Sequence, residues 1–359
     1  MEVNINELLE KCIDLNASDL HLVVNSKPVI RINGVLVSIE EYEILSSDNL
    51  KNMLFKIIDD KKIKKFEDKL ELDFSYAIQN KGRFRCNYYF QRGTIAAAFR
   101  IVTSEIKSVE ELGLPPKVKE FAAYPRGLVL VCGPTGSGKS TTLASIINII
   151  NESRSENIIT IEDPIEYLHW HKKSIVSQRE IESDTTSFAT ALKHALREDP
   201  DVIMVGEMRD LETISNTLTA AETGHLVFST LHTQDAAQTI DRIIDIFPTH
   251  SQQQIRLQLA GTLKAVLVQQ LLPNKNNDGR VVAVELMTVN PAIRNMIRDI
   301  KSHQIYTVMQ SSGKEGMLMM DMSLAKLLKE GKISQEMAFE KCHNKEELTR
   351  YLNSNYIVY

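Results

Sequence analysis

The sequence has few cysteines, and none of them lies close to another. The four are Cys12, Cys86, Cys132 and Cys342. Zinc ribbons and small disulfide-bonded domains need cysteines at short, regular spacing, and no C-x-x-C pair occurs here. We therefore expect buried free thiols in a reducing compartment, rather than a zinc or disulfide framework.

Long apolar runs are also missing. A helix that crosses a membrane needs about 18 or more consecutive apolar residues, and no stretch of the chain approaches that length. The first residues, MEVNINELLEKCIDLNASDLHL, are charged and have no apolar core of the kind found in a signal peptide. The sequence thus predicts a cytoplasmic protein without direct membrane insertion, so any work at a membrane needs a partner that recruits it.

There is no excess of basic residues. Lysine and arginine number 42 against 47 aspartates and glutamates, which gives a formal net charge of -5. Domains that bind nucleic acid are usually basic, so no nucleic-acid partner is expected, although a local basic groove remains compatible with this balance. With 359 residues, of which 43% are hydrophobic, the chain is long enough for two globular domains.

Residues 1–102 have the pattern of a small α+β domain. Short runs of β-branched and aromatic residues alternate with turn signals such as Asn33-Gly34 and Asn80-Lys81-Gly82. A helix is expected at 7–15, and another from Ser47 or Asp48 to about 58. The expected strands are 20–24, 28–32, 35–39, 73–78, 83–90 and 94–101. The polar stretch 103–116 ends in two prolines and is the predicted linker or hinge.

Residues 117–359 have a different pattern, in which apolar runs alternate with helical stretches. This alternation is typical of an α/β domain with a parallel sheet. The expected strands are 128–132, 158–161, 202–205 and 226–229. From about 290 to 359 the chain is expected to be helical. Asn290-Pro291 starts a helix in which Ile293, Met296, Ile297 and Ile300 share one face.

The strongest local signal is a G-x-x-x-x-G-K-S phosphate loop between an apolar strand and an apolar helix. Its glycines let backbone N–H groups turn toward phosphates. Lys139 adds a positive charge at the β- and γ-phosphates, and the Ser140 hydroxyl suits Mg²⁺. ATP and Mg²⁺ are therefore the expected ligands. The residues expected to contact the nucleotide are Gly133, Pro134, Thr135, Gly136, Ser137, Gly138, Lys139, Ser140 and Thr141.

Carboxylates follow two of the predicted strands. Glu162 and Glu166 come after the strand at 158–161, and Glu207 comes after the strand at 202–205. Ligands bind beyond the carboxyl ends of parallel strands, so these groups should face the phosphates. Gly206 stands where an Mg²⁺-binding aspartate is usual. Glu207 is then expected to reach Mg²⁺ through water, to act as general base, or both; Glu162 and Glu166 are the other candidates for the base.

Two histidines flank the strand at 226–229. His225 and His232 could sense the γ-phosphate by hydrogen bonding, whereas an isolated histidine is more often structural. Metal binding by the pair is not expected, because no further ligands have matching spacing.

The run 196–210, LREDPDVIMVGEMRD, resembles the signature of secretion and pilus ATPases, the GspE/PilB/PilT superfamily. Four elements follow in that family's order: the phosphate loop, an acidic box at 162–166, an atypical Walker B at 202–207 and a histidine box at 223–232. ASDLHL at 17–22 is similar to the family's first domain. Resemblance thus covers essentially the whole chain.

Within the superfamily, the chain resembles the PilT-type retraction ATPases of type IV pili. Its length is similar to theirs, and it lacks the four-cysteine zinc motif of many extension-type relatives. AIRNMIRD at 292–299 is similar to the retraction-type AIRNLIRE motif, with methionine and aspartate as departures. The resemblance implies a role for Arg294 and Arg298 in coupling or retraction.

The resemblance also implies an architecture and partners. A PAS-like N-terminal domain and a RecA-like ATPase domain would form a homohexamer that acts on an inner-membrane platform protein, and indirectly on pilin, in twitching motility. In such rings, arginines of the N-terminal domain reach the phosphates. Arg85 and Arg100 are favoured over Arg83 and Arg92 for this role.

Four alternatives remain open at the level of sequence. The same fold serves pilus extension and type II secretion ATPases, and an accessory retraction ATPase would have a closely similar sequence. A DNA-translocating ring ATPase is disfavoured by the acidic balance. A nucleotide-sensing scaffold without useful turnover is disfavoured by the presence of Lys139, Glu207 and His232 together.

Overall fold

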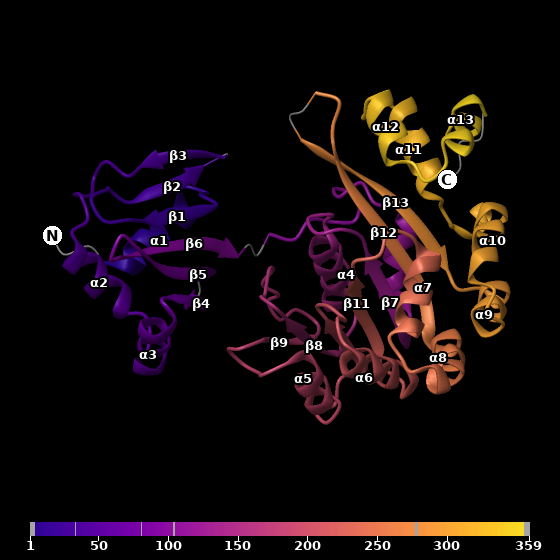
Figure 1. Ribbon diagram of the computed structural model, residues 1–359, viewed down its shortest axis with the longest axis horizontal. Coiled ribbons are helices and arrows are strands. Elements are labelled where there is room, and N and C mark those ends of the chain that lie inside the picture. Colours follow the sequence, from indigo (N-terminus) through magenta and orange to yellow (C-terminus); the bar gives the residue numbers. More distant parts are fainter. Residues whose placement is uncertain (1–3, 33, 80, 103–104, 277–278, 355–359) are drawn as a thin grey trace. The chain divides into compact units, whose positions relative to one another are not determined.

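The computed structural model describes residues 4–32, 34–79, 81–102, 105–276 and 279–354. The chain divides into two compact units, which are drawn in Figure 1. The first comprises Met1–Glu105 together with Pro164–Leu168, and the second comprises Ile106–Asp163 with His169–Tyr359.

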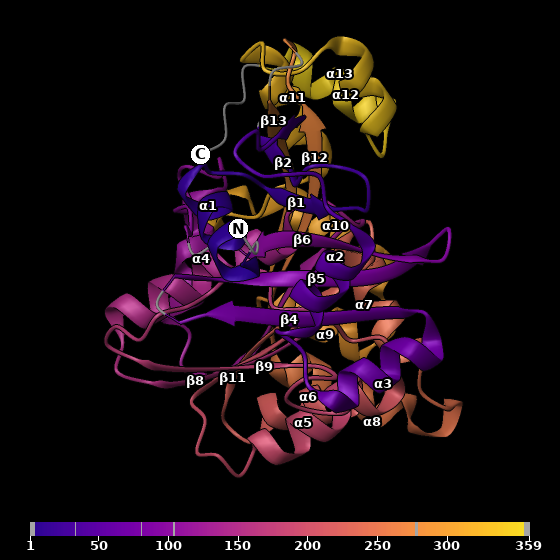
Figure 2. The same ribbon diagram turned by 90° about the vertical axis from the view of Figure 1, so that its left-hand side faces the viewer.

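The first unit is built on an antiparallel six-stranded sheet in the order β3-β2-β1-β6-β5-β4. Figure 2 shows β2, β1, β6, β5 and β4 one below another. The strands are β1 (Asp19–Leu22), β2 (Val29–Ile32), β3 (Val35–Ser38), β4 (Glu71–Ile78), β5 (Gly82–Gln91) and β6 (Thr94–Val102). All six predicted strands are thus confirmed to within about two residues at each end. Asn33 and Asn80, in two predicted turns, lie outside the described residues.

Three helices accompany this sheet: α1 (Ile5–Asp14), α2 (Ser47–Phe55) and α3 (Asp60–Lys69). The first two were predicted. The N-cap of α2 is Ser46, one residue before the expected cap, and its hydroxyl accepts a hydrogen bond from the Asn49 amide. Helix α3 was missed because its sequence is mostly charged and only Phe66 is fully buried. Its two apolar residues, Ile63 and Phe66, are too few for the sequence to show a hydrophobic face.

The second unit contains a seven-stranded sheet in the order β13-β12-β7-β11-β10-β8-β9. Neighbouring strands from β12 to β9 are parallel, and β13 is antiparallel to β12. The strands are β7 (Gly127–Cys132), β8 (Asn157–Glu162), β9 (Ile175–Glu180), β10 (Val202–Val205), β11 (Leu226–Leu231), β12 (Leu263–Pro273) and β13 (Arg280–Thr288). The four predicted parallel strands are confirmed, whereas β9, β12 and β13 were missed.

Helices cover both faces of this sheet, so its central strands are buried on both sides. The 3₁₀ helix η1 (Pro116–Ala123) and α4 (Lys139–Ser153) share one core with Val129 and Val131 of β7. Helices α5 (Phe188–Ala195), α6 (Leu211–Glu222), α7 (Ala236–Asp245) and α8 (Thr249–Thr262) share the other with Leu128 and Leu130. Of the predicted linker, Val109 and Leu114 also belong to the first of these cores.

The C-terminal part is helical, as predicted, with α9 (Pro291–Arg298), α10 (Ile305–Ser311), α11 (Met320–Lys329), α12 (Gln335–Lys341) and α13 (Lys345–Asn353). Two short 3₁₀ helices, η2 (Ser302–Gln304) and η3 (Gly313–Glu315), flank α10. Asn290 caps α9, and Ile293 and Ile297 are buried. The expectation for Ile300 is wrong: the helix ends at Arg298, and Ile300 has φ +60° and is mostly exposed.

Three of the four cysteines are buried free thiols, as expected, but Cys342 is partly exposed. Within the described ranges, no helix combines the length and the apolarity that a membrane crossing requires.

Candidate active site

The phosphate loop joins β7 to α4 at the carboxyl edge of the large sheet. The structure places Pro134, Thr135 and Gly136 at the exposed tip of the loop, while Ser137 is buried. Gly133, Gly136 and Gly138 all have positive φ, which only glycine adopts at little cost. This backbone turns the loop into a cradle that opens at the N-terminus of α4.

Gly133 is also the point of closest approach between the loop and β12. A Cβ atom added at this position would lie 2.3 Å from the carbonyl oxygen of Gln269 and 2.7 Å from Ser137 Oγ. No side chain fits there without moving the strand. The first glycine of the loop is therefore required by packing as well as by conformation.

The cradle fits an anionic ligand. The N-cap of α4 is Gly138, and no side chain among the described residues caps its first turn. The buried Ser137 hydroxyl likewise has no hydrogen-bond partner within the described ranges. Lys139 Nζ lies 2.9 Å from the Gly133 carbonyl oxygen and 3.0 Å from that of Pro134. A helix N-terminus, unfilled donors and a lysine at one loop suit the phosphates of a nucleotide.

Glu207 follows β10 at the same edge of the sheet. Strand β11 lies between β10 and β7, so Glu207 lies about 10 Å from the phosphate-loop strand at the usual strand spacing. A cavity of about 530 Å³ adjoins it, lined in part by Arg209, His232 and Gln234. A distance of about 10 Å between the two strands is of the size that a γ-phosphate and a water molecule span.

The structure explains the glycine that precedes Glu207. The Gly206 amide donates to the Ile161 carbonyl, and the Gly206 carbonyl accepts from the Thr230 hydroxyl. A Cβ atom at position 206 would lie 3.2 Å from the Ile161 oxygen. Strands β10 and β8 approach closely at position 206, which agrees with a glycine in place of an aspartate there. Glu207 is then the acidic group at this end of β10.

Glu207 is held by two cationic or polar partners. Its Oε2 lies 2.8 Å from an Arg209 guanidinium nitrogen, and its Oε1 lies 3.2 Å from His232 Nε2. Burial raises the pKa of this carboxyl, but the hydrogen bond from Arg209 and the charges of His232 and Arg209 outweigh burial and hold the pKa below its usual range. Glu207 is therefore ionised at neutral pH and oriented.

The two predicted histidines lie at opposite ends of β11. His232 follows the strand and contacts Glu207, whereas His225 precedes it, beside the first residue of β7, where the Gly127 amide donates to its carbonyl. His225 Nδ1 lies 2.9 Å from the Ala220 carbonyl, at the end of α6. The structure brings only His232 to the phosphate-loop edge. The role proposed for His225 at the γ-phosphate has no geometric support in this unit.

Glu162 and Glu166 differ in their surroundings. Glu162 ends β8 and is buried, and its Oε1 accepts hydrogen bonds from the Thr160 hydroxyl and the Gln178 amide. Such a fixed carboxylate is better suited to support than to proton transfer. Glu166 is exposed and belongs to the segment grouped with the first unit. Its part in catalysis stays a prediction.

Arg85 and Arg100 are directly opposite each other on β5 and β6 of the first unit. Arg100 Nε donates to the Asp19 carboxylate at 2.8 Å, although the arginine side chain is largely exposed. Their expected contact with phosphate also stays a prediction.

Sequence reasoning missed three residues at this site. Arg209, two positions after Glu207, forms its ion pair; the residue stood in the family signature without an assigned role. Gln269 abuts the phosphate loop from β12, a strand that was not predicted. The Thr239 hydroxyl lies 2.6 Å from that of Thr233 and within hydrogen-bonding distance of Cys132 Sγ, which ties the histidine turn to the end of β7.

Comparison with known proteins finds a match to one protein family. Residues 1–338 match the family model described as "Type II/IV secretion system protein". The chain is 48% identical over 339 residues to the type IV pilus retraction ATPase PilT of Pseudomonas aeruginosa strain PAO1, covering 94% of this chain and 98% of that protein. It is 48% identical over 322 residues to a twitching motility protein of Neisseria gonorrhoeae, covering 90% of this chain and 86% of that one.

A solved structure agrees with this similarity. A crystal structure of the pilus retraction motor PilT with bound ADP superimposes with a TM-score of 0.89 at 48% identity, covering 97% of this chain and 100% of that one. The same α/β architecture therefore occurs in a protein that holds a nucleotide.

Proposed function

The chain belongs to the type II/IV secretion system protein family, and on this premise we propose that it is an ATP-hydrolysing motor that drives type IV pilus retraction. The observation that carries the proposal is the convergence of the phosphate loop, Glu207 and His232 at the carboxyl ends of β7, β10 and β11. The near full-length similarity to PilT favours retraction over extension or secretion.

Each residue has a part in hydrolysis. Backbone N–H groups of the loop and the first turn of α4 hold the β- and γ-phosphates, and Lys139 exchanges its two carbonyl contacts for phosphate oxygens. Glu207 orients the attacking water and accepts its proton, since its carboxylate is ionised and directed by Arg209 and His232. His232 would report loss of the γ-phosphate to α7 through its neighbour Thr233, whose hydroxyl contacts that of Thr239.

Mg²⁺ fits the same site. The Ser140 hydroxyl would bind it directly and Glu207 through water, and the ion would neutralise charge on the β- and γ-phosphate oxygens. The absence of an aspartate at position 206 is the reason for the indirect contact.

The motor would work as a homohexamer. Arg85 and Arg100 would then supply positive charge to phosphates. The predicted 103–116 linker between the N-terminal domain (1–102) and the ATPase domain (117–359) would act as the hinge in its part before Val109, because Val109 and Leu114 are buried in the core of the second unit. We place the ring on the cytoplasmic side, where ATP is available, recruited to the inner membrane by a pilus platform protein and acting indirectly on pilin.

The enzymatic part is tested by Glu207→Gln, which keeps the shape of the side chain but removes the carboxylate. We expect kcat to fall by about 10²–10⁴-fold with nucleotide binding retained. Glu212→Gln is the matched control, because Glu212 is an exposed acid on the next helix. Binding of ATP by the wild type without turnover in any oligomeric state would favour a sensing scaffold instead.

The cellular part is tested in a strain that lacks the chain. Loss of a retraction motor should abolish twitching while surface pili persist or accumulate, and the wild-type gene but not Glu207→Gln should restore movement. A strain without surface pili would identify an extension ATPase. Unchanged twitching would point to an accessory motor or to another secretion system.

A further inference from the structure

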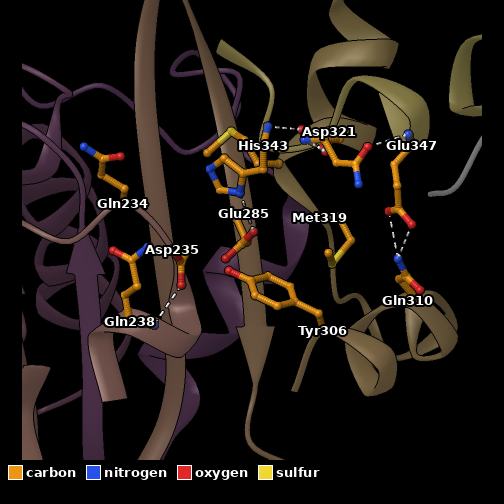
Figure 3. Close-up of a pocket in the computed structure, with 12 residues that line it drawn as sticks. Gln234, Asp235, Gln238, Glu285, Tyr306, Gln310, Met319, Asp321, His343 and Glu347 are labelled. Carbon is orange, nitrogen blue, oxygen red and sulfur yellow. Dashed lines mark hydrogen bonds and ion pairs between the residues drawn. The ribbon is translucent and has the colours of Figure 1, made fainter. Parts of the chain in front are cut away.

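A second cavity adjoins the one beside Glu207. It measures about 510 Å³ and is walled by β13, the start of α7, α10, α11 and the turn between α12 and α13. Figure 3 shows the side chains that line it. Gln234 and Gln238 line both this cavity and the one beside Glu207. The two sites thus share one wall.

Glu285 of β13 is the unusual group in this cavity. Its side chain is fully buried. Oε1 accepts a hydrogen bond from the Ala236 amide at the first turn of α7, 2.8 Å away, but Oε2 has no hydrogen-bond partner among the described residues. The imidazole of His343 lies above the carboxylate, with Nδ1 4.0 Å from Oε2 (Figure 3). A buried carboxylate oxygen aimed into a cavity without a donor costs free energy.

The other acids of the cavity already have partners. Asp235 accepts from the Gln238 amide and the Tyr306 hydroxyl. Asp321 accepts from the amides of His343 and Asn344 at 2.7 and 2.9 Å. The remaining acid, Glu347, accepts two hydrogen bonds from Gln310. Of the four acids that line the cavity, Glu285 is thus the one with a buried carboxylate oxygen that accepts no hydrogen bond from the described residues.

We propose that this cavity binds an organic cation, an ammonium or guanidinium group that donates hydrogen bonds to Glu285 Oε2. Four acidic side chains and one histidine line the cavity, so its field favours a positive ligand. A guanidinium or ammonium also supplies the several donors that such a cavity can accept. The cation would come either from a free amine or from a lysine or arginine of a second copy of this chain.

Two other occupants fit less well. A metal ion needs several converging acids or imidazoles, and no group of three or more such side chains within the described ranges is arranged to hold one. An anion would be repelled by the carboxylates. An organic cation has both the positive charge that suits the acidic lining and the hydrogen-bond donors that Glu285 Oε2 lacks.

The protonation of Glu285 should be linked to binding. Burial raises the pKa of Glu285 to about 7; the hydrogen bond from the Ala236 amide lowers it, while Asp235 and Asp321 raise it further. His343 is the basic side chain among the residues that line the cavity. Because the cation binds the ionised carboxylate, its affinity should rise about tenfold between pH 6 and pH 8.

The test uses methylguanidinium and n-butylammonium chloride as probes, titrated into the full-length protein by calorimetry at pH 6 and pH 8. N-methylurea, which has nearly the shape of methylguanidinium without its charge, is the ligand control. We expect at least one cation to bind at pH 8, and Glu285→Gln to weaken it about tenfold or more and to remove the pH dependence. Glutamine keeps the acceptor for the Ala236 amide, so α7 stays capped.

Two further variants separate charge from folding. Glu346→Gln removes an exposed acid of α13 that does not line the cavity, and it should leave binding unchanged. His343→Ala should retain or strengthen binding, because the competing basic ring is lost. A loss in His343→Ala equal to that in Glu285→Gln would overturn the proposal, as would cations that bind no better than N-methylurea.

The source of the cation is identified by comparing probe binding to the single subunit with probe binding to the assembled protein. Binding of a probe to both the single subunit and the assembled protein would assign a free amine. Binding to the single subunit alone would assign a side chain of a neighbouring copy.

Discussion

Replacing the first glycine of the phosphate loop should be far more harmful than replacing its middle glycine. At Gly133, φ is +134° and an added Cβ would lie 2.3 Å from a strand carbonyl oxygen. Backbone strain of about 1–3 kcal/mol adds to overpacking of about 1–3 kcal/mol. At Gly136, φ is +78° but no atom lies within 4 Å, so only strain of about 1–2 kcal/mol applies.

Thermal and urea unfolding of Gly133→Ala and Gly136→Ala, both without nucleotide, measure the difference. The Gly133 variant should be less stable by at least about 1 kcal/mol, or about 2–4 °C in Tm for a unit of this size. Both variants change one glycine of the same loop to alanine, so residue-intrinsic effects cancel. Equal losses would refute the close approach of Gln269, and a more damaging Gly136→Ala would refute the description of the loop.

Three further outcomes follow from the same structure. Activity should need ionised Glu207, so the acidic limb of the pH profile of kcat/KM should lie below the usual pKa range of glutamate. Arg209→Ala removes a partner that lowers the pKa of Glu207 and should move this limb to higher pH. Burial lowers the pKa of His169 to about 4, so unfolding free energy should fall by about 1.4 kcal/mol per pH unit below about 6.5 and level off below about 4; His169→Gln should lack this slope in urea titrations. Tyr88→Phe should cost about 1–3 kcal/mol in unfolding free energy, because the buried hydroxyl donates to the Leu54 carbonyl.

The fold was predictable where periodicity and turn residues agree. Strand β4 (ELDFSYAI) alternates clearly, the turns before β5 and β6 contain glycine, and β7 is a short apolar run before a phosphate loop. The sequence of β12, LKAVLVQQLLP, contains leucine, alanine, lysine and glutamine, which favour helices. It becomes a strand because β7 and β13 pair with both its edges. Tertiary pairing of this kind has no local signal.

The candidate active site also contains some residues that the sequence predicted and others that it did not. The phosphate loop and Glu207 were found because each follows a strand and carries its own chemistry. His225 and His232 were grouped as a pair, although the strand between them places them at opposite edges of a parallel sheet, so the role of His225 at the γ-phosphate stays a prediction. The Arg209 ion pair depends on how the chain turns after β10, which composition does not specify.

The capping of α7 shows why some residues near a site are beyond sequence reasoning. Asp235 caps the helix locally, through a bond to an amide three residues on, and such caps are readable from sequence. Glu285 caps the amide of Ala236, 49 residues away, from a strand that was itself unpredicted. An isolated glutamate within VAVELM reads as one polar residue in a strand or helix. Only the fold shows that it is buried, that one of its oxygens accepts no hydrogen bond from the described residues, and that its cavity shares Gln234 and Gln238 with the cavity beside Glu207.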